Sequence, residues 1–137
     1  VLAVTTNGAV YGWGSNHIGQ LGNVKQSYFD RPIPIVFPEK ISAVSAGMHY
    51  SLALASSGKV YAWGWNGFGQ LGLGDLQSRN TPTVIPSLSG VRSIAAGETH
   101  SLALTQNQFL GWGCNESGQL GNAAIRQITP NIFFEIA

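Results

Sequence analysis

The sequence predicts an all-β protein made of similar four-stranded antiparallel sheets. The first observation behind this prediction is a segment that contains Trp-Gly and closes on Gly-Gln-Leu-Gly, and that occurs three times, at residues 11–22, 61–72 and 110–121. The second is that short strand patterns and glycine or proline turns flank each copy. A motif that recurs about every 50 residues is typical of repeat architectures, so the chain is interpreted repeat by repeat.

A hairpin is the first element expected in each repeat. Residues 2–14 and 52–64 each contain a short strand pattern, a turn with glycine and a second strand pattern. The third copy, at residues 102–113, is one residue shorter and lacks the turn glycine. We therefore expect a tighter or irregular turn near Asn107.

An outer strand and an inner strand complete the repeat. After each Gly-Gln-Leu-Gly loop the chain reaches a proline followed by apolar residues, at 32–36, 82–85 and 130–134. Proline is tolerated at the first residue or on the edge of a sheet, so we expect a short outer strand that begins with it. The next segment, at 41–47, 91–97 and in truncated form at 136–137, is rich in small residues. Such a strand suits a crowded position where several sheets converge.

Four strands per repeat predict the blades of a β-propeller, in which four-stranded sheets are arranged radially. Side chains alternate along a strand, so large aromatic residues of the Trp-Gly strand share one face and small residues share the other. An aromatic face packed on the small face of the next sheet would fill the gap between twisted sheets. The residues expected in this blade core are Tyr11, Trp13, Tyr61, Trp63, Trp112 and His100.

The composition excludes several classes of function. Charged residues make up 9% of the 137 and the net charge is +1, so no strong field is available to attract nucleic acid or an anionic membrane. The apolar segments are too short for a membrane-spanning helix, and the first residues lack the charged start of a secretory signal. The single cysteine, Cys114, favours an intracellular protein, cytoplasmic or nuclear. The chain begins without methionine, within a strand pattern, and we expect it to be part of a longer protein.

One repeat carries a family resemblance. Residues 97–104 read Gly-Glu-Thr-His-Ser-Leu-Ala-Leu, and the loop after the Trp strand reads Trp-Gly-x-Asn-x-x-Gly-Gln-Leu-Gly. This combination resembles the regulator of chromosome condensation repeat, and the resemblance covers essentially the whole chain. It implies a propeller that typically has seven blades, of which this chain would supply about three. The whole chain, 1–137, is then a partial β-propeller with repeats at approximately 1–40 (incomplete), 41–90 and 91–135.

Three arrangements follow for a chain that cannot close such a ring alone. It is a fragment of a longer propeller, a chain completed by further copies, or an open arc. Open blade edges would expose unpaired backbone and apolar faces, which makes self-association through these edges an expected property of the chain.

Motifs that could carry catalysis or bind a cofactor have structural explanations. Residues 67–72 form a literal G-x-G-x-x-G, but glycine and proline follow it where a nucleotide-binding loop would enter a helix. His100 and Tyr50 occupy the same repeat position, which favours a hydrogen-bonding brace over a catalytic base or a metal ligand. The carboxylates form no pair close in sequence for acid–base chemistry. We therefore expect no catalytic residue, no metal site and no cofactor.

The loops offer a binding surface. In an up-and-down sheet alternate connections emerge at opposite ends, so the loops after the small-residue strands and after the Trp strands should share one face. Loops on a rigid scaffold are common recognition sites, and exposed aromatic residues and arginine are common anchors. The candidate partner-binding residues are His17, Trp65, Phe68, Asp75, Arg79 and Glu116.

The sequence thus predicts a non-enzymatic protein–protein interaction module. The resemblance implies an alternative, part of a guanine nucleotide exchange factor for a small GTPase. Chromatin or other nucleic-acid binding by this stretch is not expected, because the charge is near neutral and no basic tail is present. A third branch of the family, the plant ultraviolet-B photoreceptors, would have Trp and Arg after the motif glycine. Met48 and His49, then Glu98 and Thr99, stand there instead, which counts against light sensing.

Overall fold

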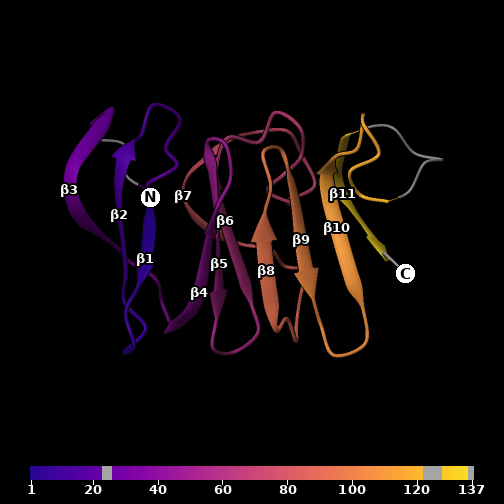
Figure 1. Cartoon of the computed structure of the whole chain (residues 1–137), viewed down its shortest axis with the longest axis horizontal. Coiled ribbons are helices and arrows are strands. Elements are labelled where there is room, and N and C mark those ends of the chain that lie inside the picture. Colours follow the sequence, from indigo (N-terminus) through magenta and orange to yellow (C-terminus); the bar gives the residue numbers. More distant parts are fainter. Residues whose placement is uncertain (23–25, 122–127, 136–137) are drawn as a thin grey trace.

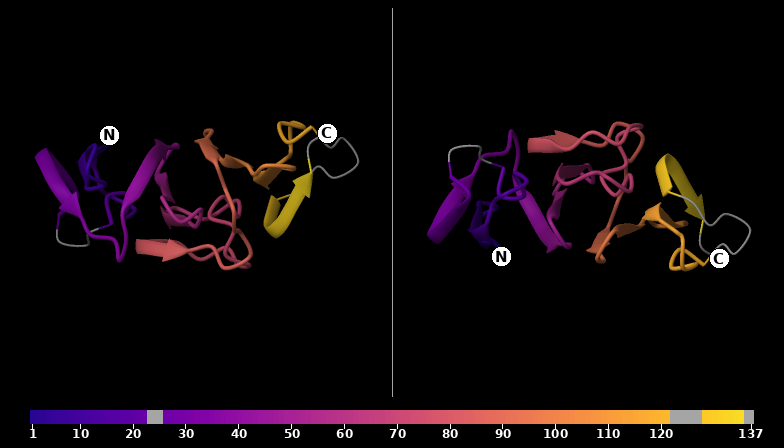
Figure 2. Two further views of the ribbon diagram at one scale, coloured as in Figure 1. Left: turned by 90° about the horizontal axis from the view of Figure 1, so that it is seen from below. Right: turned by 90° about the horizontal axis from the view of Figure 1, so that it is seen from above.

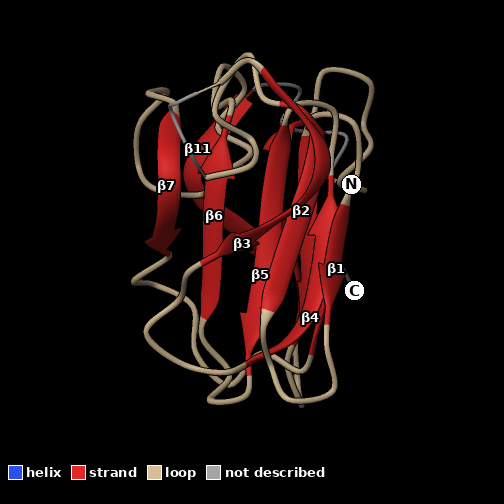
Figure 3. Cartoon of the chain, turned by 90° about the vertical axis from the view of Figure 1, so that its left-hand side faces the viewer, coloured by secondary structure: helices blue, strands red, loops and turns tan. Residues whose placement is uncertain are grey.

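Three antiparallel sheets standing side by side make up the computed structural model, which describes residues 1–22 and 26–121, and the backbone of 128–135. The first sheet has the order β1 (Leu2–Val4), β2 (Val10–Ser15), β3 (Tyr28–Ile35). The second has the order β4 (Ile41–Ala46), β5 (Tyr50–Ala55), β6 (Val60–Gly64), β7 (Arg79–Val84). The third has the order β8 (Ser93–Ala96), β9 (His100–Leu104), β10 (Phe109–Cys114), β11 (Ile128–Glu135). The described residues contain strands and loops without helices (Figures 1 and 3).

The sheets are arranged as propeller blades. Seen along the strands, β1, β4 and β8 gather on one side, and β3, β7 and β11 spread outward (Figure 2). The strands β4 and β8 are the small-residue strands, and the Ser45 hydroxyl accepts a hydrogen bond from the Ala96 amide at 2.9 Å. The second and third sheets therefore confirm the prediction of four-stranded antiparallel blades, the first sheet contains three strands, and the convergence of the small-residue strands β4 and β8 is also confirmed.

The outer strands begin earlier than the sequence suggested. We expected each to start at its proline, but β3 starts at Tyr28 and β7 at Arg79. In the second blade Ala62 pairs with Thr83 and Gly64 pairs with Arg79, so residues 80–82 together lie opposite the single residue Trp63. The proline falls within this bulge, where the ladder is already interrupted and a missing N–H disrupts no regular pairing.

The hairpin turns differ as expected. In the second blade the Ala55 amide donates to the Lys59 carbonyl at 2.9 Å. In the third blade the Thr105 amide donates to the Gln108 carbonyl at 2.9 Å, which closes a turn that is one residue shorter. The predicted tighter turn around Asn107 is confirmed.

Two hydrophobic clusters lie between the blades. Trp63, which is 0% exposed, packs with Val10 and Ile35 of the first blade, and Phe37 places its ring edge-on at 5.5 Å between centroids. Trp112 occupies the equivalent place between the second and third blades, against the face that carries Val60 and Ala62. The strands β6 and β10 therefore present their tryptophans to the preceding blade, and β6 presents Val60 and Ala62 to the next one.

Candidate partner-binding face

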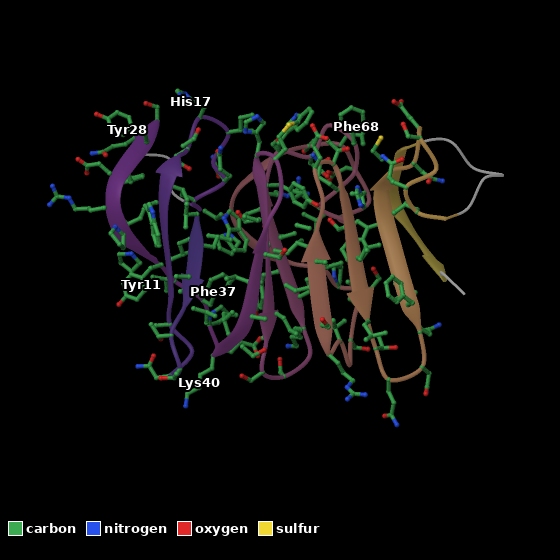
Figure 4. All side chains as sticks on the ribbon, in the orientation of Figure 1. Tyr11, His17, Tyr28, Phe37, Lys40 and Phe68 are labelled. Atoms are coloured by element: carbon green, nitrogen blue, oxygen red, sulfur yellow. The ribbon has the colours of Figure 1, made fainter. Side chains whose placement is uncertain are left out.

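The long loops emerge at one end of the blades. His17 and Phe68 lie at this end, together with Tyr28, whereas Lys40 lies at the opposite end (Figure 4). We call the end that carries residues 15–22, 47–49, 65–78 and 97–99 the loop face. It contains the loops after the small-residue strands as well as those after the Trp strands, as the strand alternation predicts.

The Gly-Gln-Leu-Gly motif fixes the base of the loop face. In the second blade the Asn66 side-chain oxygen accepts a hydrogen bond from the Leu71 amide at 3.0 Å, and the Gln70 side-chain oxygen accepts one from the Phe68 amide at 2.9 Å. Gly69 has a φ of 75°, which a residue with a side chain adopts only with strain. Leu71 is 0% exposed and anchors the loop in the core.

The same motif joins neighbouring blades. The Gln20 main-chain carbonyl accepts hydrogen bonds from the Trp63 indole nitrogen at 2.8 Å and from the Ser51 hydroxyl at 2.7 Å. The Gln70 carbonyl receives the equivalent pair from the next blade, at 2.9 Å from Trp112 and 2.8 Å from Ser101. Both the tryptophan and the serine of one repeat therefore donate hydrogen bonds to the loop of the repeat before it.

Tyr50 links the inner ends of two blades. Its hydroxyl donates to the His100 carbonyl and lies 3.0 Å from the Ser101 hydroxyl oxygen. Burial raises the pKa of Tyr50 well above its ordinary value, so the phenol stays protonated and can donate. Gly47 lies directly against the ring, and a Cβ there would sit 2.0 Å from the nearest ring carbon. The bracing role proposed for this repeat position is thus visible at Tyr50.

His100 occupies the equivalent position in the third blade. It is half-buried, its ring lies against Gly97, and burial lowers its pKa. Among the other residues expected in the blade core, Trp63 and Trp112 are fully buried and Tyr61 is buried at 7% exposure. Trp13 is half-buried and Tyr11 is 37% exposed. No other sheet of the described residues covers the side of the first blade on which these two lie.

An aromatic group gathers two of the predicted partner-binding residues. Trp65 contacts Phe68 edge-on with ring centroids 5.4 Å apart, and both side chains are half-buried. Trp65 also contacts the ring of His49, with ring centroids 6.4 Å apart. The Trp65 amide also donates to the His49 carbonyl at 2.8 Å, which ties the two loops together.

Asp75 and Arg79 form a second pair within the same loop. Arg79 Nη2 lies 2.8 Å from Asp75 Oδ2, and Arg79 also donates to the Gln77 carbonyl at 2.7 Å. The Asp75 carboxylate accepts a further hydrogen bond from the Asn66 amide group at 3.2 Å. The hydrogen bond from Arg79, followed by that from the Gln77 amide, lowers the pKa of Asp75. This pair therefore shapes the loop, and its arginine is already occupied.

His17 and Glu116 lie apart from the aromatic group. His17 is exposed and lines a shallow hollow between the first and second blades that Ser78, Arg79 and Asn80 also line. Glu116 is exposed on the loop of the third blade. The structure thus brings Trp65 and Phe68 together and Asp75 and Arg79 together, whereas His17 and Glu116 border the face.

Sequence reasoning missed Met48 and His49 as members of this surface. Met48 is 39% exposed and His49 is exposed. Both follow the motif glycine of the small-residue strand, and strand alternation places that loop on the loop face. The position alone could therefore have identified them.

The described residues contain no group of three or more His, Cys, Asp or Glu side chains that could hold a metal ion. In the same part of the chain no helix has the length and hydropathy that a membrane span requires.

The fold and its inter-blade hydrogen bonds define the class of protein, a segment of a repeat-built β-propeller. The model of the regulator of chromosome condensation (RCC1) repeat matches residues 7–54 and 57–104, and a second model of this repeat matches 41–70 and 91–119. The chain belongs to the RCC1 repeat family.

Solved structures agree with this assignment. Yeast RCC1 (Prp20) bound to Kap60 is 25% identical, with a TM-score of 0.85, over 94% of this chain and 33% of that one. Prp20p from Saccharomyces cerevisiae, in a structure described together with its binding to Gsp1p and histones, is also 25% identical, with a TM-score of 0.85, over 99% and 36%. Human WBSCR16 is 26% identical, with a TM-score of 0.84, over 99% and 36%.

The chain therefore spans about a third of the length of these structures. A comparison with curated proteins gives no significant match.

Proposed function

We propose that this chain is a non-enzymatic protein–protein interaction module that docks a partner on its loop face. The observation that carries the proposal is the partly exposed aromatic group of His49, Trp65 and Phe68, which lies on two loops that hydrogen bond to each other. Aromatic side chains on a rigid base lose little conformational entropy on binding and are frequent energetic centres of interfaces. The buried Asn66 and Gln70 side chains supply that rigid base.

The remaining predicted residues have supporting roles in this proposal. His17 and Glu116 form the polar rim, and the Asp75–Arg79 pair keeps the long loop of the second blade in shape. The buried tryptophans hold the blades together. We further propose that repeats 1–40, 41–90 and 91–135 form part of a larger ring, in which another blade covers Tyr11 and Trp13. The free, buried Cys114 fits an intracellular location, in the cytoplasm or the nucleus.

Capture of partners by the intact protein tests the interaction proposal. We expect Trp65→Ala combined with Phe68→Ala to reduce recovery of the specific partner at least tenfold, because loss of two interface anchors commonly costs this much or more. The matched control is Gln106→Ala with Gln108→Ala, two exposed residues of the hairpin turn at the opposite end. Undiminished capture by the aromatic double variant would refute docking on the loop face.

An exchange factor for a small GTPase is the second candidate. It is supported by the similarity to Prp20p, whose structure was described together with its binding to the small GTPase Gsp1p. A nucleotide-release assay with the intact protein and candidate GTPases tests it. Release faster than in buffer alone, and slowed by the aromatic double variant, is expected if the loop face promotes exchange. Release that never exceeds the buffer rate would exclude this candidate and leave the interaction module in place.

A further inference from the structure

We propose that the loop face of the middle blade recognises an arginine-bearing segment of a protein partner, through Met48, His49, Trp65 and Phe68 together with the exposed Glu98 of the adjoining loop. This inference rests on the proposed function and specifies the chemistry of the partner. Two local features of the fold converge on these residues, and each is unfavourable for the fold taken alone.

The first feature is the backbone of His49. Its φ is 120°, and it is the one residue other than glycine with a positive φ among those the structure describes. Side chains rarely adopt this conformation, and glycine would fit it without strain. Thr99 holds the same repeat position in the third blade without a positive φ. The third blade therefore does not share the strain at His49.

The second feature is the buried amide nitrogen of Gln70. In the first blade the equivalent nitrogen of Gln20 donates to the Ser15 hydroxyl at 3.4 Å. Trp65 stands where Ser15 stands, and the Gln70 amide nitrogen has no hydrogen-bond acceptor among the described residues, although Gln70 is 0% exposed. A buried donor without an acceptor is unfavourable. Serine at position 65 would therefore give the Gln70 amide nitrogen an acceptor that tryptophan does not provide.

Both features arise from side chains that reach the surface at the same place. His49 is exposed, Trp65 is half-buried, and their rings are in contact. The Trp65 ring packs directly against Gly67, and a Cβ at position 67 would come within 2.7 Å of the ring. Local conflicts of this kind are expected at functional sites, where a side chain is kept for what it binds.

The surrounding charge indicates which group binds. The Glu98 carbonyl accepts a hydrogen bond from the Met48 amide at 3.2 Å, so the main chain of Glu98 in the third blade adjoins the loop that carries Met48 and His49, and the Glu98 side chain is exposed. Arg79 pairs with Asp75 at 2.8 Å, so its positive charge is used in that ion pair and does not neutralise the Glu98 carboxylate. Aromatic rings beside a carboxylate attract a guanidinium group, which stacks on a ring and pairs with the acid.

Stability measurements on paired variants test the two local conflicts. We expect His49→Gly to unfold at a higher temperature than His49→Ala, although glycine ordinarily destabilises relative to alanine. Trp65→Ser should likewise unfold at a higher temperature than Trp65→Ala, because serine returns an acceptor to Gln70. The control pair, Thr99→Gly and Thr99→Ala, should show the ordinary order. Alanine variants at 49 and 65 that equal or exceed their partners would overturn the inference.

Peptide binding tests the chemistry of the partner. The probes are the acetylated and amidated peptide of four Gly-Arg repeats and its neutral counterpart with citrulline in place of arginine. Binding is followed by the NMR signal of the Trp65 indole N–H, which is assigned by its loss in Trp65→Ser. We expect the arginine peptide to bind at least roughly fivefold more tightly, as a cation–π contact and an ion pair at a partly exposed site would give.

Carboxylate variants separate recognition at this site from general attraction to acidic residues. Glu98→Gln should abolish most of the preference for arginine over citrulline, whereas Asp30→Asn, at an exposed acid on β3, should preserve it. Equal binding of the two peptides, no binding of either, or a preference that survives Glu98→Gln would overturn the inference. Loss of partner capture in the aromatic double variant would still support the interaction module in those cases.

Discussion

Truncation of Trp63 is the change that most directly probes the packing between blades. The side chain is 0% exposed and fills the space between the first and second blades, with Phe37 edge-on at 5.5 Å. Its indole nitrogen donates to the Gln20 carbonyl at 2.8 Å, and this bond joins the Gly-Gln-Leu-Gly loop of one repeat to the Trp strand of the next.

The structure sets the expected loss of stability for two variants. Trp63→Ala removes the whole ring system and should lower the free energy of unfolding by about 3 to 5 kcal/mol, as large-to-small substitutions in cores do. Trp63→Phe keeps most of the volume and loses the hydrogen bond. The Gln20 carbonyl still accepts from Ser51 at 2.7 Å, so it is not left unpaired, and we expect a loss of about 1 to 2 kcal/mol.

Urea denaturation of the intact protein, followed by circular dichroism, measures both losses. Tyr28→Ala is the matched control, because Tyr28 is an aromatic residue that is 64% exposed, and its truncation should change stability by less than about 0.5 kcal/mol. The reasoning is refuted if Trp63→Ala unfolds at the same urea concentration as the wild type, or if the alanine and phenylalanine variants are equally stable.

Further predictions concern the loops and their titration. Gly47→Ala should destabilise the protein by about 1 to 3 kcal/mol in the same denaturation assay, because its Cβ would overlap the Tyr50 ring; an unchanged midpoint would show that the ring can move. Asp75→Asn should speed hydrogen exchange in loop 65–78 at neutral pH. In the wild type, the protection factors of this loop should be highest above the ordinary pKa of aspartate and should fall as the pH drops through the lowered pKa of Asp75, so protection factors that do not change with pH would contradict the role of Arg79. His100 has a lowered pKa, so stability should fall as the pH drops below about 6.5, and His100→Gln should remove this part of the dependence.

Repetition made much of the fold predictable from the sequence. Three copies of one pattern located the hairpins, the aromatic strands and the small-residue strands, and alternation along β6 placed Trp63 and Ala62 on opposite faces. The starts of the outer strands were not predictable in this way. Pro82 suggested that the outer strand starts there. In the structure β7 already pairs with β6 at Arg79, and residues 80–82 form a bulge opposite Trp63 before pairing resumes at Thr83. Bulges depend on the partner strand, which local sequence does not specify.

The candidate site was predictable in outline only. Strand alternation was enough to place Trp65 and Phe68 on the loop face, because it depends on topology. The contact between Trp65 and His49 depends on how two loops far apart in sequence approach each other. The pairing of Asp75 with Arg79 also changed the interpretation of the arginine, since a residue proposed as a free anchor already has a partner. Side-chain partners of this kind follow from three-dimensional packing.

The most direct test of docking on the loop face is hydrogen exchange of the intact protein with and without its captured partner. The account predicts slower exchange at residues 47–49 and 65–78 in the complex, and unchanged exchange in the hairpin turns at 56–59 and 105–108. Protection of those turns, with residues 47–49 and 65–78 unaffected, would contradict it.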